Sequence, residues 1–280
     1  MICELSKNEY HKIRSLIKGQ EDINVTINSI IDKNNRGKIY VDNLDKPRVA
    51  IIWAIGCMYY IIGDTDNEDF NSSLDTFITN VLGPDSLAIC GGTHFGITIC
   101  QDENKWTRNL NAIFNYRNPY KEYRYYYVFD KNKYKNYEND LPEGYIIKRI
   151  DKDIINNDLE NLIVNDILGD FWISVDNFLD KGIGFCVLKE NKIISNCFSG
   201  YVSGEFHDIV IRTYGEENER KGFATSVSRA FIDCCILKNI TPCWSTDEEN
   251  ISSQKIAEKC GFKLYKKCKS YYFPFLQEHK

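Results

Sequence analysis

The chain has 280 residues, which is long for one compact domain and sufficient for two of about 140 residues each. Hydrophobic residues make up 43% of it and aromatic residues 13%, so it can bury real cores and is not a disordered protein. The formal net charge of −5 argues against a general binder of nucleic acid, because that function needs a basic face that displaces counterions from phosphates.

Cysteine use and hydropathy favour a cytoplasmic protein. The opening residues, MICELSKNEYHK, are charged from position 4 onward, and the longest apolar run, 50–62, is too short to span a bilayer, so no membrane association is expected. The 11 cysteines include no C-x-x-C pair and mostly lie in apolar runs, which is typical of reduced, buried thiols. The histidines have no ligand spacing among themselves or with cysteine, so no metal site is expected.

The first half of the chain is expected to form an α/β domain. Helices are predicted around residues 8–18, 68–81 and 104–115, and strands at GKIYVDN, RVAIIWAIGCMYYIIGD, SLAICG and FGITICQD. KEYRYYYVFD is a further expected strand, because aromatic residues and valine favour pleated surfaces. The polar stretch NYENDLPEG predicts a boundary near 138–144, so we expect domains at 1–138 and 141–280.

The sequence of the second half predicts elements in this order: a strand, a helix, three strands, a helix, a strand, a helix and terminal strands. GYIIKRI begins this order, and DKDIINNDLENLIVNDIL is the first helix, with one apolar side made of Ile154, Ile155, Leu159, Leu162, Ile163 and Ile167. GIGFCVLKENKIISNCFSGYV forms two strands about a turn at 190–191, and FHDIVIRT forms the third. ITPCWST, NISSQKIAEKCGF and FKLYKKCKSYYFPF supply the rest.

A faint internal repeat links the two halves. GKIYVDNLDKPRVAIIWAIG and GIGFCVLKENKIISNCFSG both read as a strand, a short turn and a longer strand. The pattern leaves open whether the N-terminal domain is a degenerate duplicate of the C-terminal one.

NERKGFATSVSRAF, residues 218–231, predicts an anion-binding helix start. One apolar stripe recurs at steps of four and three: Phe223, Val227, Phe231, Cys234 and Leu237. A helix start exposes unpaired N–H groups and the positive end of the peptide dipole, Gly222 permits close approach, and Arg220 and Lys221 add charge. Phosphate suits such a site, although the P-loop motif is absent. A solvated loop ahead of a core-packing helix is the alternative.

Taken in order, HDIVIRT, a loop, RKGFAT, a helix, PCWST and NISSQKIAEKCGF with paired terminal strands resemble the GNAT acetyltransferase superfamily over residues 141–275. The fuller pattern, with LPEGY, GIGFCVL, ISNCFSG and PCWSTDEEN, resembles the two-domain branch associated with zwittermicin A resistance. The resemblance implies an α/β (α+β) class of fold, with a C-terminal GNAT domain whose mixed sheet is flanked by helices, and acetyl-CoA as co-substrate.

In that superfamily the glycine turn and helix start bind the coenzyme A pyrophosphate, and a splayed strand before it holds the pantetheine. The resemblance implies pantetheine contacts from the backbone of Ile211, Arg212 and Thr213. It implies phosphate contacts from Arg220, Lys221, Gly222, Phe223, Ala224 and Thr225. Asn250 and Ser253 fall on the family's N-x-x-S pattern beside the pantetheine arm, with helix capping as their alternative role.

The implied reaction is acetyl transfer to a primary amine, of a small molecule by association with the resistance branch. Asp208 matches the strand position of a catalytic glutamate and is the first candidate base; Glu205 and His207 are alternatives on the opposite face of the strand. Two residues depart from the family pattern: Glu219 replaces a usual Arg or Gln, and Ala257 replaces a tyrosine general acid.

These departures favour the second hypothesis, a regulatory module that binds acyl-CoA but has lost transfer. Tyr214, Tyr265 and Tyr272 are possible substitutes for the missing acid. The cluster Lys263, Lys266, Lys267 and Lys269 is expected to be a solvated strand face. CGGTH, residues 90–94, is interpreted as a turn and not as the site of a catalytic thiol.

Overall fold

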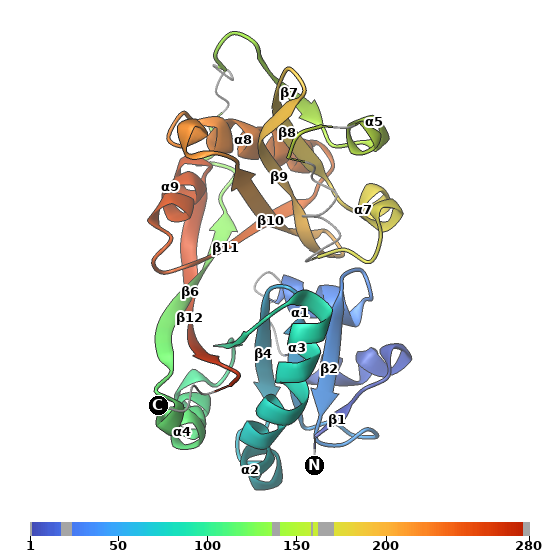
Figure 1. Ribbon diagram of the computed structural model, residues 1–280, viewed down its shortest axis with the longest axis vertical. Helices are drawn as coiled ribbons and strands as arrows, with labels where there is room; N and C mark the ends of the chain where they lie inside the picture. Colours follow the sequence, from blue (N-terminus) through green and yellow to red (C-terminus); the bar gives the residue numbers. More distant parts are fainter. Residues whose placement is uncertain (1, 18–23, 136–140, 158, 162–170, 277–280) are drawn as a thin grey trace. The chain divides into compact units, whose positions relative to one another are not determined.

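The computed structural model describes residues 2–17, 24–135, 141–157, 159–161 and 171–276. The chain divides into two compact units, which we call the first unit (Met1–Tyr125 with Lys267–Lys280) and the second unit (Tyr126–Lys266). Figure 1 labels most of the helices and strands of both. Among the described residues, no helix is long and apolar enough to cross a membrane.

The first unit builds a mixed sheet from the N-terminal half of the chain. Its elements are β1 (Cys3–Glu4), η1 (Lys7–Leu16), α1 (Val25–Ile31), β2 (Gly37–Val41), β3 (Val49–Ala54), β4 (Met58–Gly63), α2 (Glu68–Phe77), the π-helical turn η2 (Ile78–Leu82), α3 (Gly83–Cys90), β5 (His94–Ile99), α4 (Glu103–Phe114) and η3 (Asn115–Arg117). The strands lie in the order β1-β2-β3-β4-β5, antiparallel except for the parallel pair β4 and β5. Large buried rings, including Trp53, Phe70, Phe95, Trp106 and Phe114, fill the core beside it.

The second unit follows β6 (Tyr120–Phe129), which begins in one unit and ends in the other. Its elements are β7 (Tyr145–Arg149), α5 (Lys152–Asn156), α7 (Val175–Lys181), β8 (Gly184–Lys189), β9 (Lys192–Ser203), β10 (Phe206–Thr213), η4 (Glu216–Asn218), α8 (Phe223–Leu237), β11 (Thr241–Asp247), α9 (Ile251–Lys259) and β12 (Phe262–Pro274). The strand order is β7-β8-β9-β10-β11, antiparallel except for the parallel pair β10 and β11. Helix α8 packs against β8, β9, β10 and β11.

The two units repeat one order of elements. β2-β3-β4-α2-β5-α4-β6 corresponds to β8-β9-β10-α8-β11-α9-β12, with the parallel pair at the same place in each. The predicted internal repeat is therefore present in the fold. The last strand of each repeat runs into the other unit: β12 pairs with β5 through Ser270–Pro274, and β6 neighbours β11. The domain expected at 141–280 includes the whole of β12.

Two predicted elements of the first half need correction. SLAICG was predicted as a strand and is the end of helix α3. Pro84 in the first turn and Gly91, which has a left-handed φ of 69° at the C-cap, enclose this helix and override its apolar strand-like composition. RVAIIWAIGCMYYIIGD is two strands, β3 and β4, joined by a turn at Gly56 with a φ of 78°.

Three predictions in the second half also need correction. A helix was expected at 151–168, and the described residues of that range form only the short helix α5. The helix ends because Asn157 has an extended backbone and its side-chain Nδ2 donates to the Asp153 carbonyl at 2.6 Å. Leu162, Ile163 and Ile167 lie outside the described residues. FKLYKKCKSYYFPF forms one strand, β12, instead of several. Leu237 was expected on the apolar stripe of α8 but is exposed at the end of the helix, and Cys235 is the buried residue there.

Candidate functional site

Strands β10 and β11 share a ladder over only the first part of their length. Within the described residues the parallel pairs are Phe206 with Thr241, His207 with Pro242 and Asp208 with Cys243. β10 instead pairs with β9 along its whole length, with a β-bulge between Asp208 and Ile209. The ladder to β11 therefore ends at the bulge, and the backbone groups of Ile211–Thr213 that point away from β9 lie beyond it.

A short loop from β10 to α8 is fixed by its own polar groups. The buried Asn218 donates its side-chain Nδ2 to the Tyr214 carbonyl at 2.7 Å. The Tyr214 N–H donates to the Ile194 carbonyl of β9 at 2.9 Å. Arg220 and Gly222 have left-handed φ values of 58° and 87°, which turn the chain into the helix. The loop leaves the side chains of Arg220 and Lys221 exposed at the start of α8.

The start of α8 is an uncapped helix N-terminus. Its N-cap residue is Gly222, and no side chain accepts a hydrogen bond from the first turn; the first bond inside the helix runs from the Ser226 N–H to the Gly222 carbonyl at 2.9 Å. The N–H groups of Phe223, Ala224 and Thr225 thus precede the helical hydrogen-bond ladder. A Cβ built on Gly222 meets no atom within 4 Å. These donors, the open space and the two cations fit a pyrophosphate.

The equivalent helix start in the first unit, α2 after β4, has the opposite character. Its N-cap Asn67 accepts from the Phe70 N–H at 3.0 Å, and Glu68 and Asp69 fill the first turn. A cap that is already occupied by a side chain, with carboxylates beside it, disfavours an anion. Of these two helix starts, only that of α8 suits a phosphate.

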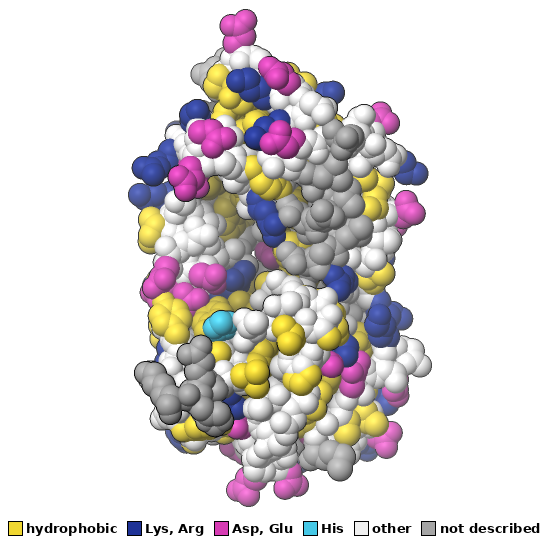
Figure 2. Space-filling view, in the orientation of Figure 1, with side chains coloured by type: hydrophobic (Ala, Val, Ile, Leu, Met, Phe, Trp, Pro, Cys, Tyr) yellow, Lys and Arg dark blue, Asp and Glu magenta, His cyan; other side chains and the backbone are white. Residues whose placement is uncertain are grey.

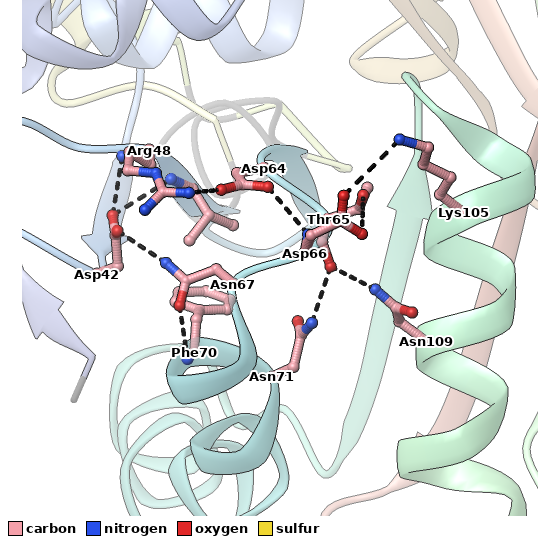
Figure 3. A network of polar contacts seen from close by, with 11 residues as sticks. Asp42, Arg48, Asp64, Thr65, Asp66, Asn67, Phe70, Asn71, Lys105 and Asn109 are labelled. Carbon is pink, nitrogen blue, oxygen red and sulfur yellow. Dashed lines mark hydrogen bonds and ion pairs between the residues drawn. The ribbon is translucent and has the colours of Figure 1, made fainter.

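The loop before α2 is closed by contacts within the first unit. Figure 3 shows Asp64 pointing toward Arg48 and Asp42 toward Asn67, and the latter pair forms a hydrogen bond of 2.9 Å from Nδ2 of Asn67. The Thr65 carbonyl accepts from the side chains of Asn71 and Asn109 at 2.9 and 2.6 Å. These bonds join the loop to α2 and α4, so its polar groups are used to hold the fold.

Asn250 and Ser253 have structural partners in α9. Asn250 is the N-cap, and its Oδ1 accepts from the Ser253 N–H at 3.0 Å. Ser253 Oγ accepts from the indole N–H of Trp244 on β11 at 3.0 Å. A pantetheine contact would be additional to these roles and stays a prediction. Ala257 on the same helix is fully buried, so a core methyl stands where the general acid of many relatives is expected.

The three candidate bases lie in different surroundings. Asp208 is partly buried on β10, at the end of the ladder to β11. Glu205 is exposed in the turn before β10, where its carbonyl accepts from the Thr241 N–H at 2.8 Å. His207 is only 3% exposed and its Nδ1 lies 2.8 Å from Ser199 Oγ. Burial, with a smaller contribution from Lys238, lowers the pKa of His207 to about 4, so it is neutral at pH 7.

Comparison with known proteins decides the family. The family model of GNAT acetyltransferases matches residues 14–271. The chain belongs to the GNAT acetyltransferase family. It is similar to an uncharacterized N-acetyltransferase, YdfB of Bacillus subtilis (strain 168), with 27% identity over 272 residues, which cover 97% of this chain and 98% of that protein.

Two solved structures show the same fold over nearly the whole chain. A GCN5-related N-acetyltransferase-like protein from Streptococcus suis 89/1591 has a TM-score of 0.67 at 21% identity, covering 95% of this chain and 98% of the other. A tandem GNAT protein from the clavulanic acid biosynthesis pathway has a TM-score of 0.61 at 9% identity, covering 99% of each. The predicted two-domain GNAT fold is confirmed, and this GNAT chain is an N-acetyltransferase; members of its family use acetyl-CoA.

Other polar groups singled out in the sequence have partners in the fold. Lys263 pairs with Asp130, and Lys267 donates to the Tyr125 hydroxyl at 2.9 Å while lying 4.3 Å from the centre of that ring. The Tyr214 hydroxyl accepts from the side chain of Asn196 at 2.8 Å. Within the described part of the chain, no three His, Cys, Asp or Glu side chains are grouped to hold a metal, and the cysteines are free thiols.

Proposed function

We propose that acetyl-CoA binds in the second unit, along β10 and at the start of α8. The pyrophosphate accepts hydrogen bonds from the N–H groups of Phe223, Ala224 and Thr225, and Arg220 and Lys221 add charge. The pantetheine runs along the backbone of Ile211, Arg212 and Thr213 toward Asn250 and Ser253. The observation that carries this proposal is the uncapped start of α8 with open space at Gly222.

The reaction is attack by a neutral primary amine on the thioester carbon. The new C–N bond forms, the C–S bond breaks, coenzyme A leaves as a thiolate, and one proton leaves the amine nitrogen. An amine with a pKa of about 10.4 is only about 0.04% free base at pH 7, which costs about 4.6 kcal/mol if the site does nothing. A base that removes the proton from the amine therefore lowers the activation free energy by a substantial part of this cost.

Asp208 takes that proton, directly or through a water molecule, and releases it to solvent. Its support is its position on β10 at the bulge, where the ladder to β11 ends. A backbone N–H within Ile211–Thr213 stabilises the oxyanion of the tetrahedral intermediate. Because a thiol of pKa about 8.5 leaves tolerably as a thiolate, transfer does not require the tyrosine that Ala257 replaces.

We infer that the acceptor is a small molecule with a primary amine, in a cytoplasmic setting. The free state of the cysteines supports a reducing compartment. The second candidate function is a regulatory module that binds acyl-CoA without transfer, and the burial of Ala257 in the core favours it.

Calorimetric titration with acetyl-CoA tests the binding site. Measurable affinity supports the proposal, and no heat of binding at millimolar ligand overturns it. Incubation with acetyl-CoA and a panel of amines, read by mass spectrometry of the acetylated product, separates the two functions. Mass spectrometry is preferred to thiol dyes because Cys57 and Cys90 are exposed and react with them. Binding without any product favours the regulatory module.

Asp208→Asn tests the base. We expect unchanged affinity for acetyl-CoA and a rate at pH 7 lowered by about 10²-fold or more, with recovery as the pH approaches the pKa of the amine. Glu205→Gln is the matched control, because Glu205 is exposed in the neighbouring turn. Loss of rate in Glu205→Gln and not in Asp208→Asn transfers the role to Glu205.

A further inference from the structure

Two adjoining pockets lie in the first unit, and none of their lining residues is among those proposed for acetyl transfer. The larger has a volume of about 670 Å³, and its walls include Pro84, Leu87 and Pro274 together with the polar side chains of Thr93 and His94. The smaller, of about 370 Å³, is lined by polar residues of α2, η2 and η3. Thr79, Phe275 and Leu276 line both, so the two pockets are adjacent, and we call the larger the apolar chamber and the smaller the polar chamber.

Two of the residues that line both chambers are held by the core of the unit: Phe275 is buried, and Thr79 lies in an unusual helical turn. The π-helical turn Ile78–Leu82 buries Ile78 and Leu82 and leaves Thr79 at the chambers. Phe275 packs edge-on against Tyr59 and Phe95, and its N–H donates to the Thr93 carbonyl at 3.0 Å. π-Helical turns are rare and frequently mark functional sites. The site is therefore preformed by the core of the unit.

Leucines at the apolar chamber are exposed to water. Leu87 is 60% exposed and Leu276 is 75% exposed. Figure 2 shows hydrophobic side chains grouped beside a histidine on the face that it presents. Single exposed leucines on a protein surface are common and need no explanation. Exposed leucines at a concave pocket are different, because they indicate a site for an apolar ligand. The CGGTH segment contributes Gly92, Thr93 and His94 to this chamber.

The polar chamber favours a head group without negative charge. The Arg117 side chain is only 5% exposed, and its Nε and Nη2 donate to Asp75 and Thr79, each at 2.6 Å. Asp75 also accepts from the Tyr116 hydroxyl at 2.5 Å. The guanidinium is thus neutralised by its own carboxylate, and the polar side chains at the chamber include the oxygen-bearing Asp75, Thr79 and Tyr116.

We propose that this double pocket binds a small molecule with an apolar body of about the size of an aromatic ring system and a hydroxyl or amine head. The body lies in the chamber of Leu87 and Phe275, and the head donates hydrogen bonds in the chamber of Asp75. The volume lies within the range of small-molecule sites. The proposal does not depend on the proposed acetyl-CoA site, because the two share no residue.

Fluorine NMR of 4-fluorophenethyl alcohol with the whole protein tests the proposal. For a probe of this size we expect a Kd of about 1 to 6 mM. 4-Fluorophenethylamine should bind comparably, whereas 4-fluorophenylacetate should bind at least severalfold more weakly because its carboxylate faces Asp75. Tighter binding of the acetate than of the alcohol contradicts the assignment of the polar chamber.

A pair of leucine variants locates the probe. Leu87→Asp should weaken binding of the alcohol about tenfold or more, and Leu44→Asp should leave it unchanged, because Leu44 is 44% exposed in the same unit and does not line either chamber. Saturating acetyl-CoA should not displace the alcohol. No binding by any probe at several millimolar, equal effects of the two variants, or displacement by acetyl-CoA overturns the proposal.

Discussion

Replacing Gly222 by alanine should affect ligand binding at the start of α8 more than it affects the stability of the fold. Gly222 has φ 87° and ψ −7°, a left-handed conformation that costs a residue with a Cβ about 1–2 kcal/mol. The added Cβ meets nothing within 4 Å, so this strain is the whole cost to the fold. We therefore expect Gly222→Ala to fold, with a free energy of unfolding lowered by about 1 kcal/mol.

The affinity for acetyl-CoA should fall much further than the stability. The methyl group occupies the space through which the pyrophosphate approaches the first turn of α8, and each hydrogen bond to a charged group contributes about 1.5–3 kcal/mol. Loss of one such bond raises the Kd by about 10- to 100-fold, which calorimetry resolves directly. Gly91→Ala is the control, because Gly91 has a left-handed φ of 69°, also has no atom within 4 Å of an added Cβ, and lies in the first unit.

A truncated ligand sharpens the test. S-acetylpantetheine lacks the pyrophosphate, so Gly222→Ala should bind it as the unaltered protein does. Gly222→Ala with full affinity for acetyl-CoA, or with equal losses for both ligands, would refute the assignment of the pyrophosphate to this helix start.

The other predictions concern stoichiometry, capping and pH. Calorimetry should give one acetyl-CoA per chain, because the filled cap and acidic first turn of α2 disfavour a second site; a stoichiometry of two contradicts that reasoning. Asn250→Asp should keep the cap of α9 and hence the stability, whereas Asn250→Ala should lose about 1 kcal/mol; weaker acetyl-CoA binding by Asn250→Asp would show that the amide contacts the ligand. Because the folded pKa of His207 is about 4, the unfolded chain binds more protons between pH 4 and about 6.5, so this residue's contribution to stability rises with pH across that window and is lost on acidification. Urea unfolding from pH 4.5 to 7 should show the slope, worth up to about 3 kcal/mol, and His207→Gln should reduce it.

The elements of the second half could be predicted because local signals agreed with the tertiary fold. Asn250 caps α9, Gly261 has the left-handed φ of 85° that its position after the helix requires, and the turn at 190–191 joins β8 and β9. Each of these depends on a few neighbouring residues. The GNAT resemblance rests on the same local patterns in order, which is why it covered this half and left the first half less certain.

The wrong predictions came from signals that oppose one another or act over long distances. SLAICG is apolar enough for a strand, yet Pro84 and Gly91 decide for a helix. No local pattern predicts that β12 pairs with β5, because the two strands are far apart in sequence. The surroundings of the candidate bases could not be predicted from the sequence either. The bulge after Asp208 and the burial of His207 both depend on the pairing of β10 with β9.

The two units differ at the position that corresponds to the proposed acetyl-CoA site. In the second unit the ladder between β10 and β11 joins the first residues of both strands and leaves their carboxyl ends without it. In the first unit the ladder between β4 and β5 runs from Tyr59 with Ile97 to Ile61 with Ile99, the last residue of β5. The carboxyl end of β5 is thus joined to its neighbour, and the helix that follows β4 carries its own cap.

The ladder to β5 also ends before Ile62 and Gly63, the last residues of β4, so the strand pairing alone does not distinguish the two units. The helix start does, since a pyrophosphate needs helix N–H groups that no side chain caps. The first unit does have a pocket, but between η2, α3 and the last residues of β12, where the strand from the other repeat completes the wall. Strand exchange therefore gives the first unit a surface that its own repeat does not encode alone.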